Sequence, residues 1–109
     1  MAAPRMTLPT QLVLRELLSD PAREMYGLEI CAAAGLPSGT IHPILARLEK
    51  VGWLRSRWED VDPAAQGRPR RRYYSLDPNS LGLVQAAIQR ADASASALAR
   101  LRPGLTGGA

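Results

Sequence analysis

The chain has 109 residues, of which 46% are hydrophobic and 22% charged, and a formal net charge of +4. This length allows one small domain, and the composition excludes a disordered chain. Its single cysteine excludes an internal disulfide framework, and no apolar stretch reaches the about 20 residues that cross a bilayer. Because the N-terminus also lacks a secretory signal pattern, we expect a cytoplasmic protein without membrane association.

The positive charge is concentrated in one segment of the chain. Residues 47–72 carry eight basic and four acidic side chains, a surplus of four that equals the net charge of the whole protein. All of the eight except Lys50 are arginines, whose planar fork suits phosphates and guanine edges. This concentration of charge is the electrostatic footprint of a protein that binds a polyanion.

Two short helices are predicted near the N-terminus. The first spans about residues 8–18, with Thr7 as its cap and a proline in its first turn. The second spans about residues 26–34 and ends at Gly35, because glycine adopts the left-handed conformation of a helix stop. Cys31 lies among alanines in this helix, and we expect it to pack in the core; a redox sensor is the alternative.

A third helix is predicted from Ser38, its expected cap, to a stop at Gly52. Apolar side chains repeat at helical spacing and should face the core, namely Ile41, Ile44, Leu45, Leu48 and Val51. The opposite side carries Ser38, Thr40, His42, Pro43, Arg47 and Lys50. A proline within a helix costs one backbone hydrogen bond, so its presence on the outward face indicates a surface shaped to meet a ligand.

Two strands are predicted next, over residues 53–59 and 70–76, joined by a polar connection rich in turn formers. We expect Tyr74 to point inward, and Trp53 and Trp58 to pack in the hairpin and the core. These two tryptophans are also where we would first expect a planar effector, in a cavity between subunits. The basic run at the far edge of the hairpin comprises Arg68, Arg70, Arg71 and Arg72.

A last helix is predicted to begin at Asp77 and Pro78 and to reach about residue 101. Its apolar seam alternates three and four residues apart, as in helices that bury against each other: Leu81, Val84, Ile88, Ala91, Ala95 and Leu98. We expect residues 78–102 to form a homodimer interface, to which the first helix contributes. Packing of the seam on its own domain is the alternative. The tail, residues 103–109, is expected to be flexible.

These elements predict a mainly α fold with a small β-hairpin: a winged helix-turn-helix over residues 1–77, followed by one long C-terminal helix. The third helix would enter the major groove of double-stranded DNA, with its free N–H groups near phosphates. The wing arginines would lie along the backbone or in the minor groove. The expected DNA contacts are Tyr26, Ser38, Gly39, Thr40, His42, Pro43, Arg47, Arg68, Arg70, Arg71 and Arg72.

Four stretches resemble, in order and spacing, the PadR family of bacterial transcriptional regulators. They are YGLEI (residues 26–30), SGTIHPILARLE (38–49), GWL with WE (52–59) and GRPRRRYYSL (67–76). The resemblance covers the middle half of the chain and implies a homodimeric, usually repressing, DNA-binding protein that a small molecule often releases. Members of similar length dimerise through one C-terminal helix. His42 replaces the usual tyrosine, and Asp77 to Ser80 replace the threonine that commonly follows the wing.

The predicted function is a sequence-specific transcriptional regulator, a repressor that binds a pseudo-palindromic operator as a homodimer. His42 is the only histidine, which excludes a histidine metal cluster, and the scattered acids form no catalytic pair. We therefore expect no enzymatic activity, no metal and no cofactor, with DNA, a second copy of the chain and a small aromatic effector as partners. The alternatives are a winged-helix adaptor that binds an acidic protein, and a plasmid or architectural DNA binder without effector control.

Overall fold

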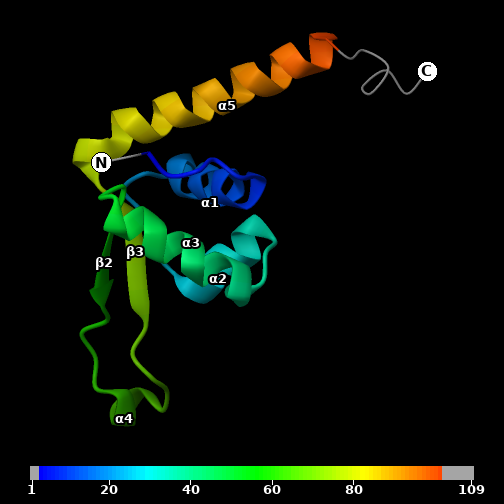
Figure 1. The fold of residues 1–109 in the computed structure, drawn as a ribbon. Coiled ribbons are helices and arrows are strands. Elements are labelled where there is room, and N and C mark those ends of the chain that lie inside the picture. The colour runs from blue at the N-terminus through cyan, green and yellow to red at the C-terminus, as the bar shows by residue number, and fades with distance from the viewer. Residues whose placement is uncertain (1–2, 102–109) are drawn as a thin grey trace.

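The computed structural model describes residues 3–101, which form a helical body, a three-stranded sheet that extends from it, and a long C-terminal helix (Figure 1). The predicted fold class is confirmed, while the predicted flexible tail lies outside the described residues. No helix within residues 3–101 is long and apolar enough to span a membrane. The elements are α1 (Leu8–Ser19), β1 (Met25–Tyr26), α2 (Gly27–Ala34), α3 (Ser38–Lys50), β2 (Leu54–Trp58), α4 (Pro63–Gln66), β3 (Arg72–Leu76), the 3-10 turn η1 (Pro78–Ser80) and α5 (Leu81–Leu101).

Local capping explains where the first two helices begin and end. The Thr7 side chain accepts a hydrogen bond from the Thr10 amide at the start of α1, which confirms the predicted cap. Gly35 ends α2 with φ of 69°, and its N–H donates to the carbonyl of Cys31 at 2.9 Å. Because only glycine adopts this conformation at little cost, the predicted helix stop is confirmed as well.

The predicted cap of α3 is wrong, although the helix itself lies where expected. Pro37 occupies the cap position, and its carbonyl accepts hydrogen bonds from the amides of Thr40 and Ile41 at 3.0 and 3.1 Å. Ser38 is therefore the first helical residue, and its side chain makes no capping bond. Pro43 lies inside the helix without ending it. The consequence is that the first turn of α3 is open toward solvent.

The sheet has one more strand than the sequence predicts. Its order is β1-β3-β2, all antiparallel, with Tyr26 opposite Tyr73 and Arg57 on the other side of Tyr73. The short strand β1 directly precedes α2, so the sheet ties the start of that helix to the wing. Two residues carry no alternating pattern, which is why β1 escapes sequence analysis. The connection between β2 and β3 also contains the single turn α4, which Asp62 caps.

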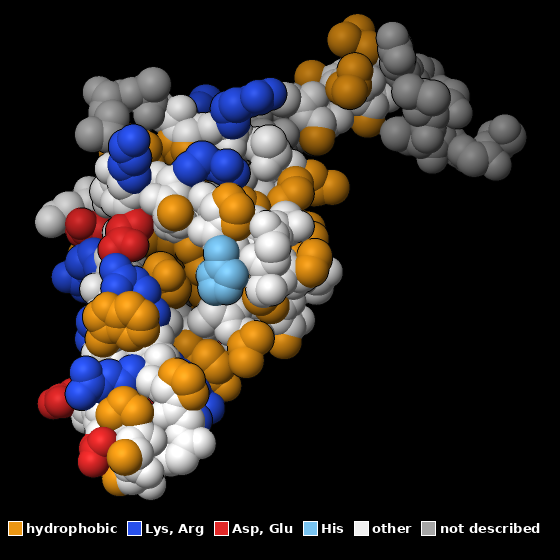
Figure 2. Space-filling model, turned by 60° about the horizontal axis from the view of Figure 1, so that its bottom comes forward, with side chains coloured by type: hydrophobic (Ala, Val, Ile, Leu, Met, Phe, Trp, Pro, Cys, Tyr) orange, Lys and Arg blue, Asp and Glu red, His pale blue; other side chains and the backbone are white. Residues whose placement is uncertain are grey.

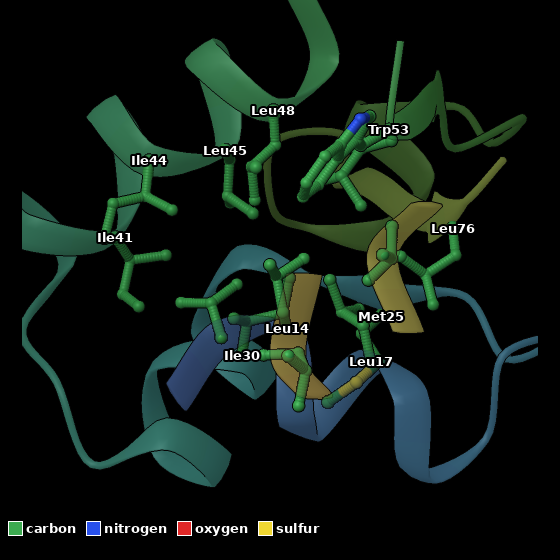
Figure 3. Packing of buried hydrophobic residues seen from close by; sticks show 14 of the residues in the cluster. Leu14, Leu17, Met25, Ile30, Ile41, Ile44, Leu45, Leu48, Trp53 and Leu76 are labelled. Carbon is green, nitrogen blue, oxygen red and sulfur yellow. The ribbon is translucent and has the colours of Figure 1, made fainter. Parts of the chain in front are cut away.

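One hydrophobic core joins the helices to the sheet (Figure 3). Side chains from α1, α2 and α3 point toward one another there, and Leu76 of β3 lies beside them. Leu54 of β2 belongs to the same buried cluster. Trp53 is 6% exposed and lies beside them, so its predicted packing role is confirmed. Leu28 of α2 is instead 70% exposed, which places one apolar side chain of that helix on the surface.

The seam predicted on the last helix divides into two halves. Val84 and Ile88 are buried in the core of the same chain, where α5 crosses α1 and the Arg15–Asp92 ion pair links the two helices. Ala95 and Leu98 are exposed, because the second half of α5 extends past α1 (Figure 1). The radius of gyration, 16.5 Å, accordingly exceeds the about 13 Å of a compact domain of this length. Packing on its own domain therefore describes the first half of the seam.

Candidate nucleic-acid interface

The outward face of α3 is polar and accessible because the opposite face is anchored in the core. Ile41, Ile44, Leu45 and Leu48 are each 3% exposed or less. Spacing of three and four residues places them on one side of the helix, so intervening residues must face solvent. Ser38, Gly39, His42, Pro43 and Arg47 are exposed and Thr40 is half-buried. All six predicted contact residues of α3 thus lie outside the core on one helix.

The tip of the wing is held by a carboxylate that gathers several donors. Arg68 donates two hydrogen bonds to Glu59, at 2.7 and 3.0 Å, and the backbone amide of Arg71 donates a third at 3.2 Å. The Arg68 bonds, with help from that amide, lower the pKa of Glu59 to about 2 against the opposing effect of desolvation. Arg68 was expected to bind DNA, but its charge is already neutralised within the wing.

The base of the wing is connected to α3 through another carboxylate. Glu49, in the last turns of α3, accepts a hydrogen bond from Ser56 of β2 and lies 3.4 Å from a guanidinium nitrogen of Arg72. The Arg72 guanidinium also lies 5.1 Å from the centre of the Trp58 ring. These contacts link α3 to the hairpin, and they engage the Arg72 guanidinium within the chain.

Arg70 and Arg71 are the wing arginines without an acidic partner among residues 3–101. Arg70 is exposed and donates from Nε to the carbonyl of Val61 at 2.9 Å, which leaves its terminal nitrogens available. The Arg71 guanidinium lies over the ring of Tyr26, 4.2 Å from its centre. Of the four predicted wing contacts, these two form no salt bridge within residues 3–101, although the charge of Arg71 acts on Glu59 through space, and both can donate hydrogen bonds to a phosphate.

A hollow of about 390 Å³ separates α3 from the wing. The start of α2, His42 and the arginine run enclose it, and Leu28, Pro69 and Tyr74 provide apolar surface. Figure 2 shows this face, with the histidine in pale blue beside hydrophobic side chains and the basic residues along the wing. A β-carbon on Gly27 would lie 3.2 Å from the His42 ring, which is a tight contact. The absence of a side chain at this position therefore leaves room for the ring.

The two tryptophans, at which an effector cavity between subunits is predicted, lie in different surroundings within one chain. Trp53 is buried in the core, whereas Trp58 is 57% exposed on the hairpin beneath Arg72. Neither side chain lines the hollow between α3 and the wing or the three other hollows described within residues 3–101. The alternation of β2 places Leu54 and Trp58 on the same side, but the hairpin extends beyond the core before Trp58 is reached.

Comparison with known families identifies a helix-turn-helix. The family model of the IclR helix-turn-helix domain matches residues 16–57, which run from α1 into β2. No curated protein matches the sequence significantly. The match covers the helices of the candidate interface and supports DNA as their ligand.

Solved structures extend this similarity to the whole described fold. A PadR family regulator from Clostridium difficile R20291 superposes with a TM-score of 0.67 at 20% identity, covering 87% of this chain and 98% of that one. One from Eggerthella lenta DSM 2243 gives 0.64 at 24% identity, covering 84% and 80%. Bordetella bronchiseptica BpsR, whose DNA binding is regulated by 6-hydroxynicotinic acid, gives 0.67 at 15%, covering 91% and 69%.

These similarities confirm the predicted resemblance at the level of the fold. The chain has the fold of winged-helix transcriptional regulators, a group that includes PadR proteins and whose members are regulators rather than enzymes. The helix-turn-helix match and the fold together support a DNA-binding transcriptional regulator. The individual contact residues remain predictions.

The ion pair at the wing tip gives a testable pH dependence. A pKa of about 2, below the ordinary 4.5, means that the pair stabilises the wing above about pH 4.5 and that this stabilisation is lost as the pH falls toward 2. Replacing Arg68 by alanine should return the Glu59 titration toward 4.5, as measured by NMR of its carboxyl carbon. Arg70→Ala is the control, since Arg70 does not contact Glu59. An unchanged Glu59 titration in Arg68→Ala would contradict the assignment.

Proposed function

We propose that this protein is a homodimeric transcriptional repressor that binds a pseudo-palindromic operator. Residues 1–77 form its DNA-binding part and residues 78–102 its dimerisation helix. The observation that carries the proposal is the joint display, on one face, of the open start of α3 and the two wing arginines without acidic partners. Short polar side chains at a helix start fit the major groove, and the adjacent arginines suit the flanking phosphates.

The second half of α5 supports the homodimer. Leu98 and Leu101 are 56% and 80% exposed there, while Leu83 at the start of the helix is 60% exposed and Leu8 of α1 is 66% exposed. Covering these exposed leucines with a second copy would remove apolar surface from water and so favour association. Two copies related by a two-fold axis would present their α3 helices to half-sites about one helical turn apart, or a multiple of it.

The fold similarity supports repression and effector control by analogy. The resemblance to PadR regulators implies a repressor, and BpsR is a structural relative whose DNA binding responds to a small aromatic acid. A small aromatic effector of this protein would bind between the subunits. Because Trp53 is buried, the exposed Trp58 would be the tryptophan that such a site offers to the effector.

Selection of bound fragments from a random pool of duplex DNA tests the proposal directly. We expect enriched sequences to contain two inverted half-sites at a fixed spacing, and the complex to contain two protein chains. A protein-interaction adaptor would enrich no sequence, and its partner would not be displaced by nonspecific duplex DNA. An architectural DNA binder would bind DNA without enriching inverted repeats.

Variants of the wing and of α3 should affect binding differently. Arg70→Ala should weaken binding to all sequences by a similar factor and reduce the slope of log affinity against log salt by about 1.8 for the dimer, because one phosphate contact is lost in each half-site. His42→Ala or Thr40→Ala should instead change the preferred base at one position, by about 1–3 kcal/mol. Fluorescence anisotropy across salt concentrations measures both effects. Arg90→Ala, a charge change on α5, is the control; a slope in Arg70→Ala equal to that of the control would remove the wing from the interface.

The dimer proposal predicts a monomer when the exposed half of α5 is made acidic. Leu98→Asp should shift the protein to a monomer in sedimentation experiments and weaken binding to the full operator far more than to a single half-site. Folding should persist, because Leu98 is 56% exposed in one chain. Ser96→Asp, on the opposite side of the helix, is the matched control. A Leu98→Asp protein that remains dimeric would exclude this half of α5 from the interface.

A further inference from the structure

The outer face of the sheet carries a continuous row of stacked side chains. Glu24 accepts two hydrogen bonds from Arg57, at 2.6 and 2.9 Å, and the Arg57 guanidinium lies 5.1 Å from the centre of the Tyr73 ring. Tyr73 meets Tyr26 edge to face, with ring centres 5.8 Å apart. The Arg71 guanidinium carbon lies over the Tyr26 ring, 4.2 Å from its centre. The cross-strand register places Tyr26 and Arg57 on either side of Tyr73, and Glu24 and Arg71, which lie just outside the strands, complete the row through their side chains.

Arg71 differs from the other arginines of this region in the way it is held. Arg57, Arg68 and Arg72 each form a salt bridge, whereas no carboxylate pairs with Arg71 within residues 3–101. An aromatic ring orients a guanidinium through its quadrupole while leaving the positive charge and the N–H donors uncompensated. The side chain is therefore ordered in advance and still able to bind an anion, which reduces the entropy that binding costs.

The hollow beside Arg71 lies where one strand of a bound duplex must run. If α3 occupies the major groove and the wing approaches the neighbouring minor groove, the backbone that separates the two grooves lies between them. That space is the hollow of about 390 Å³ between His42 and the arginine run. Its apolar lining, which includes Leu28 and Pro69, matches a deoxyribose, and Arg71 on its rim matches the attached phosphate.

Resting on the proposed function, we propose that this hollow seats one phosphate–deoxyribose unit of each half-site. Arg71 is the phosphate ligand. Tyr26 is a positioning residue that acts through its ring, by holding the Arg71 guanidinium, and not through its hydroxyl. The sequence predicts Tyr26 as a DNA contact without assigning the atom; a direct bond between its hydroxyl and a phosphate is the alternative that the variants below exclude or support.

Four variants distinguish the ring from the hydroxyl. Tyr26→Phe keeps the ring and should bind the selected operator within about twofold of the wild type. Tyr26→Leu removes the ring and should weaken binding by about three- to tenfold for each half-site, the range of a cation–π contact. Arg71→Ala should weaken binding by about ten- to a hundredfold for each half-site, as for a lost bond to a charged group. The double variant Tyr26→Leu/Arg71→Ala should bind no more weakly than Arg71→Ala.

Operators with single methylphosphonate linkages locate the contact independently of protein stability. An uncharged linkage at the facing phosphate should weaken binding of the wild type and of Tyr26→Phe but leave Arg71→Ala unchanged. Loss of binding in Tyr26→Phe equal to that in Tyr26→Leu would overturn the proposal in favour of the hydroxyl. A further loss when Tyr26→Leu is added to Arg71→Ala would also overturn it. Failure of the wild type to bind any selected duplex would instead reject the proposed function.

Discussion

Burial of one face of α3 is the constraint on which the rest of the structure depends. Four aliphatic side chains of this helix are almost completely inaccessible, and each fully buried residue of this kind contributes about 1.5–3 kcal/mol. Their burial determines which residues face outward, so the exposure of His42 and Arg47 follows from the packing of Ile41 and Leu48. The wing begins two residues after the helix cap, at Trp53 and Leu54, which enter the same core. Helix and wing are therefore positioned by one hydrophobic cluster.

Acidic side chains form salt bridges with some arginines of the hairpin and leave others without such a partner. Glu24, Glu49 and Glu59 each engage one arginine of the hairpin, and the contacts join segments up to 33 residues apart. Exposed pairs of this kind contribute little to stability individually. Their effect here is to connect segments: two of the pairs join the hairpin to the helical body, and the Arg68–Glu59 pair joins the two sides of its tip. The surplus charge of residues 47–72 is thus presented by a smaller set of side chains, among which Arg70 and Arg71 lie on the wing.

The two halves of the long C-terminal helix have different surroundings, although the apolar side chains along it form one continuous pattern in the sequence. Its first half completes the core of the chain, which a domain of this size requires because so much of its surface remains exposed. Its second half leaves the body and carries exposed leucines. In the proposed dimer, a helix that belongs to the core at one end and projects at the other would connect the position of the partner subunit to α3, through α1 and the shared core. This arrangement suits a dimer whose spacing must match DNA.

Most of the fold could be predicted from the sequence because it depends on contacts within one helical turn. Thr7 and Gly35 act on their own helices, and the spacing of apolar residues in α3 defines its buried face without reference to other elements. The site's polar face on α3 was predictable for the same reason. Only the tertiary structure decided that β1 pairs with β3 and that the Tyr26 ring lies against Arg71. The same is true of the salt bridges that two of the four wing arginines form with acidic residues. These contacts join residues that are far apart in the chain, and their energies depend on distances that no local pattern specifies.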